Sequence, residues 1–108
     1  MNAPLPDPIA AFFEASNGAV PFDPDRCFAV DAVVQDENRT HRGHAAIAAW
    51  LREAQRTTAF TAEPLEVVPR DAGMTIRARV AGNFPGSPVE LDHVFRLADD
   101  RITNLEIG

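Results

Sequence analysis

The stretch Phe28–Leu51 constrains the fold of this chain more than any other part of the sequence. Its first segment, Ala32–Asp36, alternates in the manner of a half-buried strand, so Ala32, Val34 and Asp36 share one face. Because Ala32 and Val34 are core residues by type, we expect Asp36 to point inward as well. A carboxylate at the end of an apolar strand face is either a buried structural group or a working acid or base.

A polar segment containing Arg39, His41 and Arg42 follows this strand, and we expect it to form a loop that Gly43 closes. The residues after the loop predict a helix over Ala45–Gln55. Three of its apolar residues recur at helical spacing and define the face that packs on the core: Ile47, Trp50 and Leu51.

The beginning of the chain predicts two further helices. Asp7 is the expected N-cap of the first, which ends at Asn17-Gly18 and carries Phe12 and Phe13 on its core-facing side. A second start signal at Asp23-Pro24 predicts a short helix through Phe28, in which Cys27 packs as a small hydrophobe.

The second half of the chain predicts four strands separated by turn-forming segments. They are expected over 57–68, 74–80, 89–97 and 101–107, with Pro64 marking an edge position or a bulge. In the last strand, alternation places Thr103, Leu105 and Ile107 on one face. Helices followed by a run of antiparallel strands indicate the α+β class, with the helices packed on one face of a curved sheet.

Composition limits the kinds of partner and compartment. At 108 residues the chain is expected to form a single domain, 1–108, and its net charge of −6 argues against nucleic acid and anionic membranes as partners. Its single cysteine excludes an internal disulfide, and no apolar run approaches the roughly 20 residues of a membrane span. The start, MNAPLPDP, lacks the features of an export signal, so a cytoplasmic location is expected.

Three titratable groups are candidates for chemistry. His93 is the only ionisable residue on the apolar face of its predicted strand, and Asp36 faces inward by the same alternation argument. A carboxylate and an imidazole in one apolar cavity would have separated acid and base roles, because burial and mutual charge shift their pKa values. His41 is a third candidate at the rim of such a cavity. His44 is expected to be exposed, and the histidine spacing predicts no metal site.

The segment FAVDAVVQD at Phe28–Asp36, followed by GHAAI at Gly43–Ile47, resembles the signature of the NTF2-like superfamily. The SnoaL-like polyketide cyclases and the ketosteroid isomerases belong to that superfamily. The resemblance implies an NTF2-like (cystatin-like) cone, in which a curved antiparallel sheet wraps around the N-terminal helices. It also implies a deep apolar pocket and a homodimer formed through the outer face of the sheet. The sequence has no glycine-rich phosphate-binding loop, and no cofactor is expected.

The resemblance also suggests roles for individual residues. Asp36 falls where ketosteroid isomerases keep their general base, and His93 is nearest to their oxyanion-stabilising acid. Asp92 would take that place only if the strand register slipped by one residue. Phe12 stands where those enzymes have a tyrosine, and this chain contains no tyrosine. The implied pocket lining is Phe12, Phe13, Val34, Trp50, Leu91 and Phe95.

Two functions follow as hypotheses. In the first, the protein binds a small hydrophobic molecule and catalyses acid/base chemistry of the isomerase, cyclase or dehydratase type. Asp36 is then the base, His93 the acid or oxyanion stabiliser, and His41 a helper at the rim. In the second, the protein is a non-catalytic ligand-binding or dimerisation domain, and Asp36 and His93 form a structural buried pair.

Overall fold

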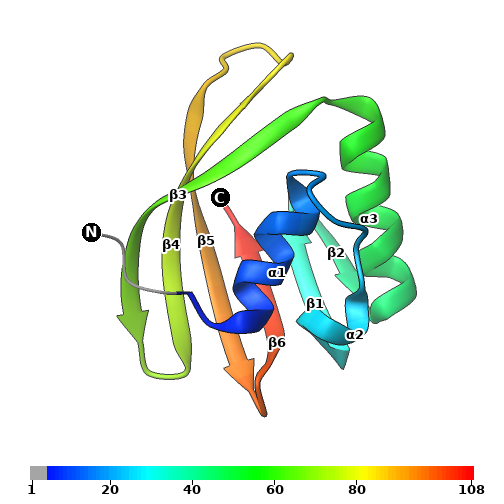
Figure 1. The fold of residues 1–108 in the computed structure, drawn as a ribbon, viewed down its shortest axis with the longest axis vertical. Coiled ribbons are helices and arrows are strands. Elements are labelled where there is room, and N and C mark those ends of the chain that lie inside the picture. Colours follow the sequence, from blue (N-terminus) through cyan, green and yellow to red (C-terminus); the bar gives the residue numbers. More distant parts are fainter. Residues whose placement is uncertain (1–4) are drawn as a thin grey trace.

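The computed structural model describes residues 5–108, which form three helices and six strands (Figure 1). The helices are α1 (Asp7–Ser16), α2 (Pro24–Cys27) and α3 (His44–Thr57). The strands are β1 (Phe28–Asp36), β2 (Arg39–Arg42), β3 (Phe60–Arg70), β4 (Gly73–Gly82), β5 (Val89–Ala98) and β6 (Arg101–Ile107). They form one curved sheet in the order β2-β1-β6-β5-β4-β3, and the predicted α+β class is confirmed.

The helices lie on the concave side of this sheet. Figure 1 shows α1 in front of the strands and α3 along the end of the sheet that β1 and β2 form. Neighbouring strands pair antiparallel except β1 and β6, which run parallel. The parallel pair places the first strand of the chain beside the last one within the sheet. None of the three helices in residues 5–108 has the length and apolar character that a membrane-crossing helix needs.

The segment after β1 is a strand, and the prediction of a loop there was wrong. Glu37 and Asn38 have φ angles of 53° and 63°, and they form a two-residue turn that folds β2 back onto β1. Such turns suit a hairpin because their twist matches that of the strands. β2 could not be predicted from the sequence, because it is a short edge strand with three exposed residues and therefore has no apolar alternation.

Helix α1 begins one residue earlier than predicted. Pro6 is its N-cap, Asp7 lies in its first turn, and no side chain caps this end. The other end is held more firmly, because the side chain of Asn17 makes two hydrogen bonds to the backbone of Ala62 in β3. The buried face of α1 includes Phe12 and Phe13, as the spacing predicted.

The late strands follow the predicted alternation with two corrections. The strand expected over 57–68 begins only at Phe60, because α3 continues to Thr57. A bulge lies between Pro64 and Glu66 in β3, which is an edge strand, so both expectations for Pro64 are confirmed. A second irregularity where β5 pairs with β6 shifts the register, and Ile102 is fully buried while Thr103 is only partly buried. The prediction that Thr103 shares the inner face was therefore wrong, because alternation fails at a bulge.

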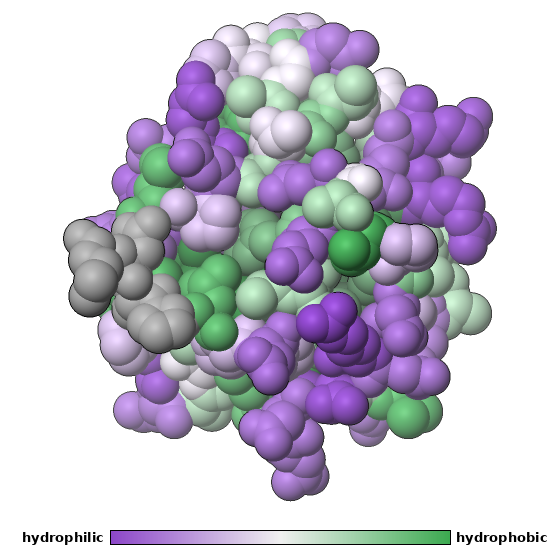
Figure 2. All heavy atoms as spheres, in the orientation of Figure 1, coloured by the Kyte–Doolittle hydropathy of each residue, from purple (hydrophilic) through white to green (hydrophobic). Residues whose placement is uncertain are grey.

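The core lies between α1 and the concave face of the sheet. Phe12 is at its centre, with its ring 5.6–6.3 Å from those of Phe13, Phe28, Phe95 and Trp50. On the outer face, Arg77 pairs across the strands with Asp92 at 3.2 Å and with Glu90 at 3.6 Å. Figure 2 shows apolar and weakly polar side chains in the centre of one view of the molecule, with hydrophilic side chains around them.

Candidate functional site

A cavity of about 800 Å³ lies between α1, α3 and the concave side of the sheet. Its apolar wall includes Phe12 and Phe13 from α1, Trp50 from α3 and Leu91 from β5. Asp36, His41 and His93 all line this cavity. The fold therefore brings His93, from late in the chain, to the same cavity as Asp36 and His41.

Asp36 ends β1, and its side chain accepts a hydrogen bond from the indole nitrogen Nε1 of Trp50 at 3.2 Å. Burial raises the pKa of the Asp36 carboxyl above its ordinary value, the Trp50 hydrogen bond opposes that shift, and the nearby Glu37 carboxylate adds to it. The indole also fixes the orientation of the carboxylate, because it donates a hydrogen bond to Oδ2 and not to Oδ1. Asp36 is thus a more basic carboxylate than usual and has a fixed orientation at the cavity wall.

The side chains around Asp36 are mostly polar. His41 on β2 lies over Trp50, with a ring-centroid distance of 5.9 Å, and it lines the cavity together with Glu37 and Arg39. Register places His41 opposite Val34, so the β1–β2 hairpin carries both Asp36 and His41. The rim of the cavity is therefore built largely by the hairpin that the sequence did not reveal.

His93 occupies a different part of the wall. It is 4% exposed, and its ring lies 5.4 Å from that of Phe13 and 6.2 Å from that of Phe95. Burial lowers the pKa of His93 to about 4, although its contact with the Leu91 carbonyl and the Asp92 charge both oppose the shift. His93 is therefore a neutral imidazole at neutral pH.

Asp36 and His93 line the same cavity but do not bind each other. Within residues 5–108 no hydrogen bond or ion pair joins them; Asp36 is bound by Trp50, and His93 contacts the Leu91 carbonyl. This geometry contradicts the hypothesis of a structural Asp36–His93 pair. Of the six expected lining residues, Phe12, Phe13, Trp50 and Leu91 line the cavity, whereas Val34 and Phe95 are buried in the core.

The lining residues that the sequence did not indicate include Ser16, Glu37 and Arg39. Ser16 is 5% exposed and ends the buried face of α1. Glu37 and Arg39 belong to the hairpin turn and to β2, which no apolar pattern marks.

The remaining candidates have structural explanations. His44 is only partly exposed, contrary to expectation, because its ring contacts the Phe28 carbonyl at 2.8 Å and the Asp25 carboxylate at 3.2 Å. Cys27 is buried, and burial raises the pKa of its thiol to about 11, which makes it a poor nucleophile. In the part of the chain that the structure describes, no three histidine, cysteine or acidic side chains form a group that could hold a metal ion.

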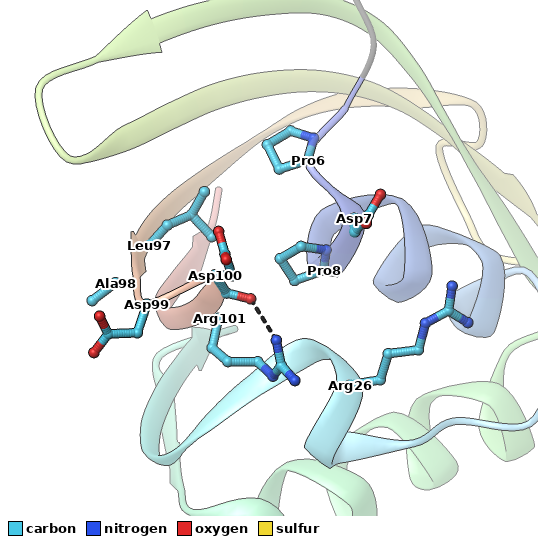
Figure 3. Close-up of a pocket in the computed structure, with 9 residues that line it drawn as sticks. All are labelled: Pro6, Asp7, Pro8, Arg26, Leu97, Ala98, Asp99, Asp100 and Arg101. Carbon is cyan, nitrogen blue, oxygen red and sulfur yellow. Dashed lines mark hydrogen bonds between the residues drawn. The ribbon is translucent and has the colours of Figure 1, made fainter.

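A second hollow, of about 640 Å³, lies where the start of α1 meets the turn between β5 and β6 (Figure 3). Arg26 and Arg101 line it together with Asp7, Asp99 and Asp100. Arg101 donates hydrogen bonds to the backbone carbonyls of Asp25, at 2.7 Å, and Asp100, at 2.8 Å. Its guanidinium therefore links α2 to this turn, and we assign the hollow a structural role.

Comparison with known proteins gives the family. The profile of the SnoaL-like domain matches residues 9–105, which is most of the chain. The chain belongs to the SnoaL-like domain family. Among curated proteins, none matches this SnoaL-like domain.

Solved structures agree with this assignment. A candidate polyketide cyclase from Sinorhizobium meliloti is 41% identical, with a TM-score of 0.87 and coverage of 96% of this chain and 95% of that one. A protein of ketosteroid isomerase-like fold from Catenulispora acidiphila, solved in complex with trimethylamine, is 19% identical, with a TM-score of 0.80 and coverage of 97% and 86%. A candidate SnoaL-like isomerase from Agrobacterium tumefaciens is 16% identical, with a TM-score of 0.73 and coverage of 93% and 92%. The last two likenesses concern the fold alone.

The site of this SnoaL-like domain is chemically asymmetric. One part of the wall carries a carboxylate whose affinity for protons is increased, and another carries a neutral imidazole. The first can take a proton from a bound molecule, and the second can form a hydrogen bond without adding charge to an apolar wall.

Proposed function

We propose that this SnoaL-like domain binds a small, largely apolar molecule in the 800 Å³ cavity and acts on it by acid/base chemistry of the isomerase, cyclase or dehydratase type. The observation that carries the proposal is Asp36, a half-buried carboxylate with a raised pKa that is oriented toward the cavity wall by Trp50. The similarity to the candidate polyketide cyclase of Sinorhizobium meliloti supports the reaction class.

In this proposal Asp36 is the general base. A raised pKa brings a carboxyl closer to the working pH, which strengthens proton abstraction while the group remains ionised. Trp50 is a positioning residue, since its Nε1–H holds Oδ2 and leaves Oδ1 for the ligand. His41, close to Trp50 and facing the charge of Asp36, is the group at the rim that can exchange the proton with solvent.

The test is deuterium uptake from D2O into a panel of apolar ketones and hydroxyketones, followed by mass spectrometry. Uptake reports proton abstraction without requiring that the product be known in advance. We expect Asp36→Asn to abolish uptake while the melting temperature stays close to that of the wild type. Glu37→Gln is the matched control, because it removes a neighbouring carboxylate of the same wall. It should retain uptake, with at most a modest decrease, since the Glu37 charge only adds to the raised pKa of Asp36. Equal uptake by wild type and Asp36→Asn would remove Asp36 as the base.

A non-catalytic ligand-binding domain is the second candidate, and one observation favours it. The chain has no tyrosine, and Phe12 stands where the related isomerases carry a hydroxyl donor. A phenyl ring cannot stabilise a developing oxyanion, and the loss of one such donor typically costs about 2.7–4 kcal/mol of the barrier. Ligand binding without deuterium uptake in any member of the panel would favour this candidate.

We also propose a homodimer that forms through the outer face of the sheet. Arg77 and Asp92 on that face already pair within one chain, so a partner would meet a polar and largely neutralised surface. Size-exclusion chromatography with light scattering decides the question, because the chain mass is 11.8 kDa. A species of single-chain mass at high protein concentration would rule out the dimer.

A further inference from the structure

The side chain of His93 has one ring nitrogen that the protein leaves unused. Nδ1 contacts the Leu91 carbonyl oxygen at 3.4 Å, and no hydrogen bond within residues 5–108 reaches Nε2. His93 is only 4% exposed, yet every fully enclosed polar side-chain atom in the described range has a hydrogen-bond partner. Nε2 has no partner, so it is not fully enclosed. Since His93 lines the cavity, Nε2 opens into it. A polar atom is therefore presented to a ligand from a nearly buried side chain.

The contact of Nδ1 determines what Nε2 can do. A carbonyl oxygen only accepts hydrogen bonds, so the proton of a neutral imidazole next to it belongs on Nδ1. The opposite tautomer would set two lone pairs against each other. With Nδ1 protonated, Nε2 carries a lone pair and accepts a hydrogen bond. This assignment differs from the oxyanion-stabilising role expected from the sequence, which would require His93 to donate.

The surroundings of Nε2 favour an uncharged partner. The imidazole lies against the rings of Phe13 and Phe95, and Leu91 and Ile107 line the same cavity. An ion buried against such a wall loses its hydration without an opposite charge to compensate. A ligand carboxylate would also meet the carboxylate of Asp36 in the lining. Glu37 and Arg39, which carry opposite charges, line the cavity as well, and both are exposed.

We propose that Nε2 of His93 binds a hydroxyl group of the ligand, so that the cavity prefers a ligand with a hydroxyl at that position over one of the same skeleton with a ketone or carboxylate in its place. This inference rests on the proposed function, because it concerns the ligand of the same cavity. Ser16 is the other nearly buried polar residue of the lining, and its hydroxyl can both donate and accept. Ser16 therefore does not discriminate between alcohol and ketone, and the selectivity comes from His93. A site that accepts a hydrogen bond rejects an analogue without the donor, because the buried acceptor is left unpaired.

The binding test compares trans-2-decalol with trans-2-decalone, which share a skeleton and differ in the donor. Isothermal titration calorimetry at pH 7 should give about tenfold tighter binding of the alcohol to the wild type. His93→Phe should bring the ratio of the two affinities close to one. Decalone binding as tightly as decalol to the wild type overturns the inference and leaves the proposed function standing. Failure of both compounds to bind overturns the proposed function and the inference together.

A second measurement needs no variant and does not depend on whether His93→Phe folds. Long-range ¹H–¹⁵N correlation spectra distinguish the two neutral tautomers of histidine, and His41 and His44 serve as internal references in the same spectrum. We expect His93 to be protonated at Nδ1, and we expect the Nε2 resonance to shift when decalol is added. A His93 ring protonated at Nε2, or an Nε2 resonance that does not respond to bound decalol, would overturn the inference.

Discussion

Asn17 joins the end of α1 to β3, and its replacement by alanine tests how the two walls of the cavity are held together. Its side-chain Nδ2 donates to the Ala62 carbonyl at 2.9 Å, and its Oδ1 accepts from the Ala62 N–H at 2.7 Å. Because β3 is an edge strand, the amide of Asn17 takes the place of a neighbouring strand at this residue. Ser16 and Ala62, on either side of this link, both line the cavity.

The expected loss follows from these two hydrogen bonds. Each intramolecular hydrogen bond contributes about 1 kcal/mol net, so Asn17→Ala should lower the free energy of unfolding by about 2 kcal/mol. Ala62 is 4% exposed, but Asn17 is exposed and β3 is an edge strand. Truncation of the Asn17 side chain should therefore open this edge to water, so we use the net value and not the larger penalty of an enclosed unpaired group. For a domain of this size, a loss of about 2 kcal/mol corresponds to a decrease in melting temperature of about 8 °C.

Urea unfolding followed by circular dichroism measures this loss directly. The matched control is Asn104→Ala, since Asn104 is an exposed asparagine on β6 and makes no side-chain hydrogen bond within the described range. The control should change the free energy of unfolding by less than about 0.5 kcal/mol. If both variants lower the free energy of unfolding by less than about 0.5 kcal/mol, and the m-value of the urea transition is unchanged, the link between α1 and β3 does not stabilise the fold as argued.

Two further predictions concern pH and the first helix. The pKa of folded His93 is about 4, below its ordinary value of 6.5, so on acidification the unfolded chain binds a proton before the folded chain does. The stability contributed by neutral His93 should therefore be lost as pH falls from about 6.5 to 4, by on the order of 3 kcal/mol, and His93→Phe should flatten urea midpoints measured across that window. Asp36, whose pKa is raised above its ordinary value of 3.8, contributes a slope of opposite sign above that pH, and titration of Asp36→Asn in parallel separates the two contributions. Phe12→Tyr should raise deuterium uptake into ketones by about a hundredfold if the missing donor limits catalysis, and uptake no faster than in the wild type contradicts that explanation.

The strands with regular alternation were predictable from the sequence. Ala32, Val34, Ile76 and Phe95 are all buried as their positions required, because one face of each strand lies on the core. The inward direction of Asp36 and His93 followed from the same rule. Alternation failed at the irregular pairing of β5 with β6, where Ile102 replaced Thr103 in the core, since pairing between strands and not local sequence determines where a bulge lies.

The residues at the rim of the cavity could not be predicted from local sequence patterns. β2 has exposed polar residues, and its turn depends on two residues with positive φ, Glu37 and Asn38, neither of which is glycine. Only pairing with β1 makes that segment a strand. The hydrogen bond from Trp50 to Asp36 could not be predicted either, although both residues were candidates, because it depends on how α3 packs beside β1.

The sequence by itself determined the fold class, the inner faces of the strands and the identity of the titratable groups in the cavity, because periodicity and residue type are local properties. The tertiary structure decided what those groups can do. It set Asp36 against Trp50 and His93 against the Leu91 carbonyl, and so it separated two residues that we had considered as a pair. The charge and tautomer of a buried group depend on the atoms that surround it, and those atoms come from elements distant in the chain.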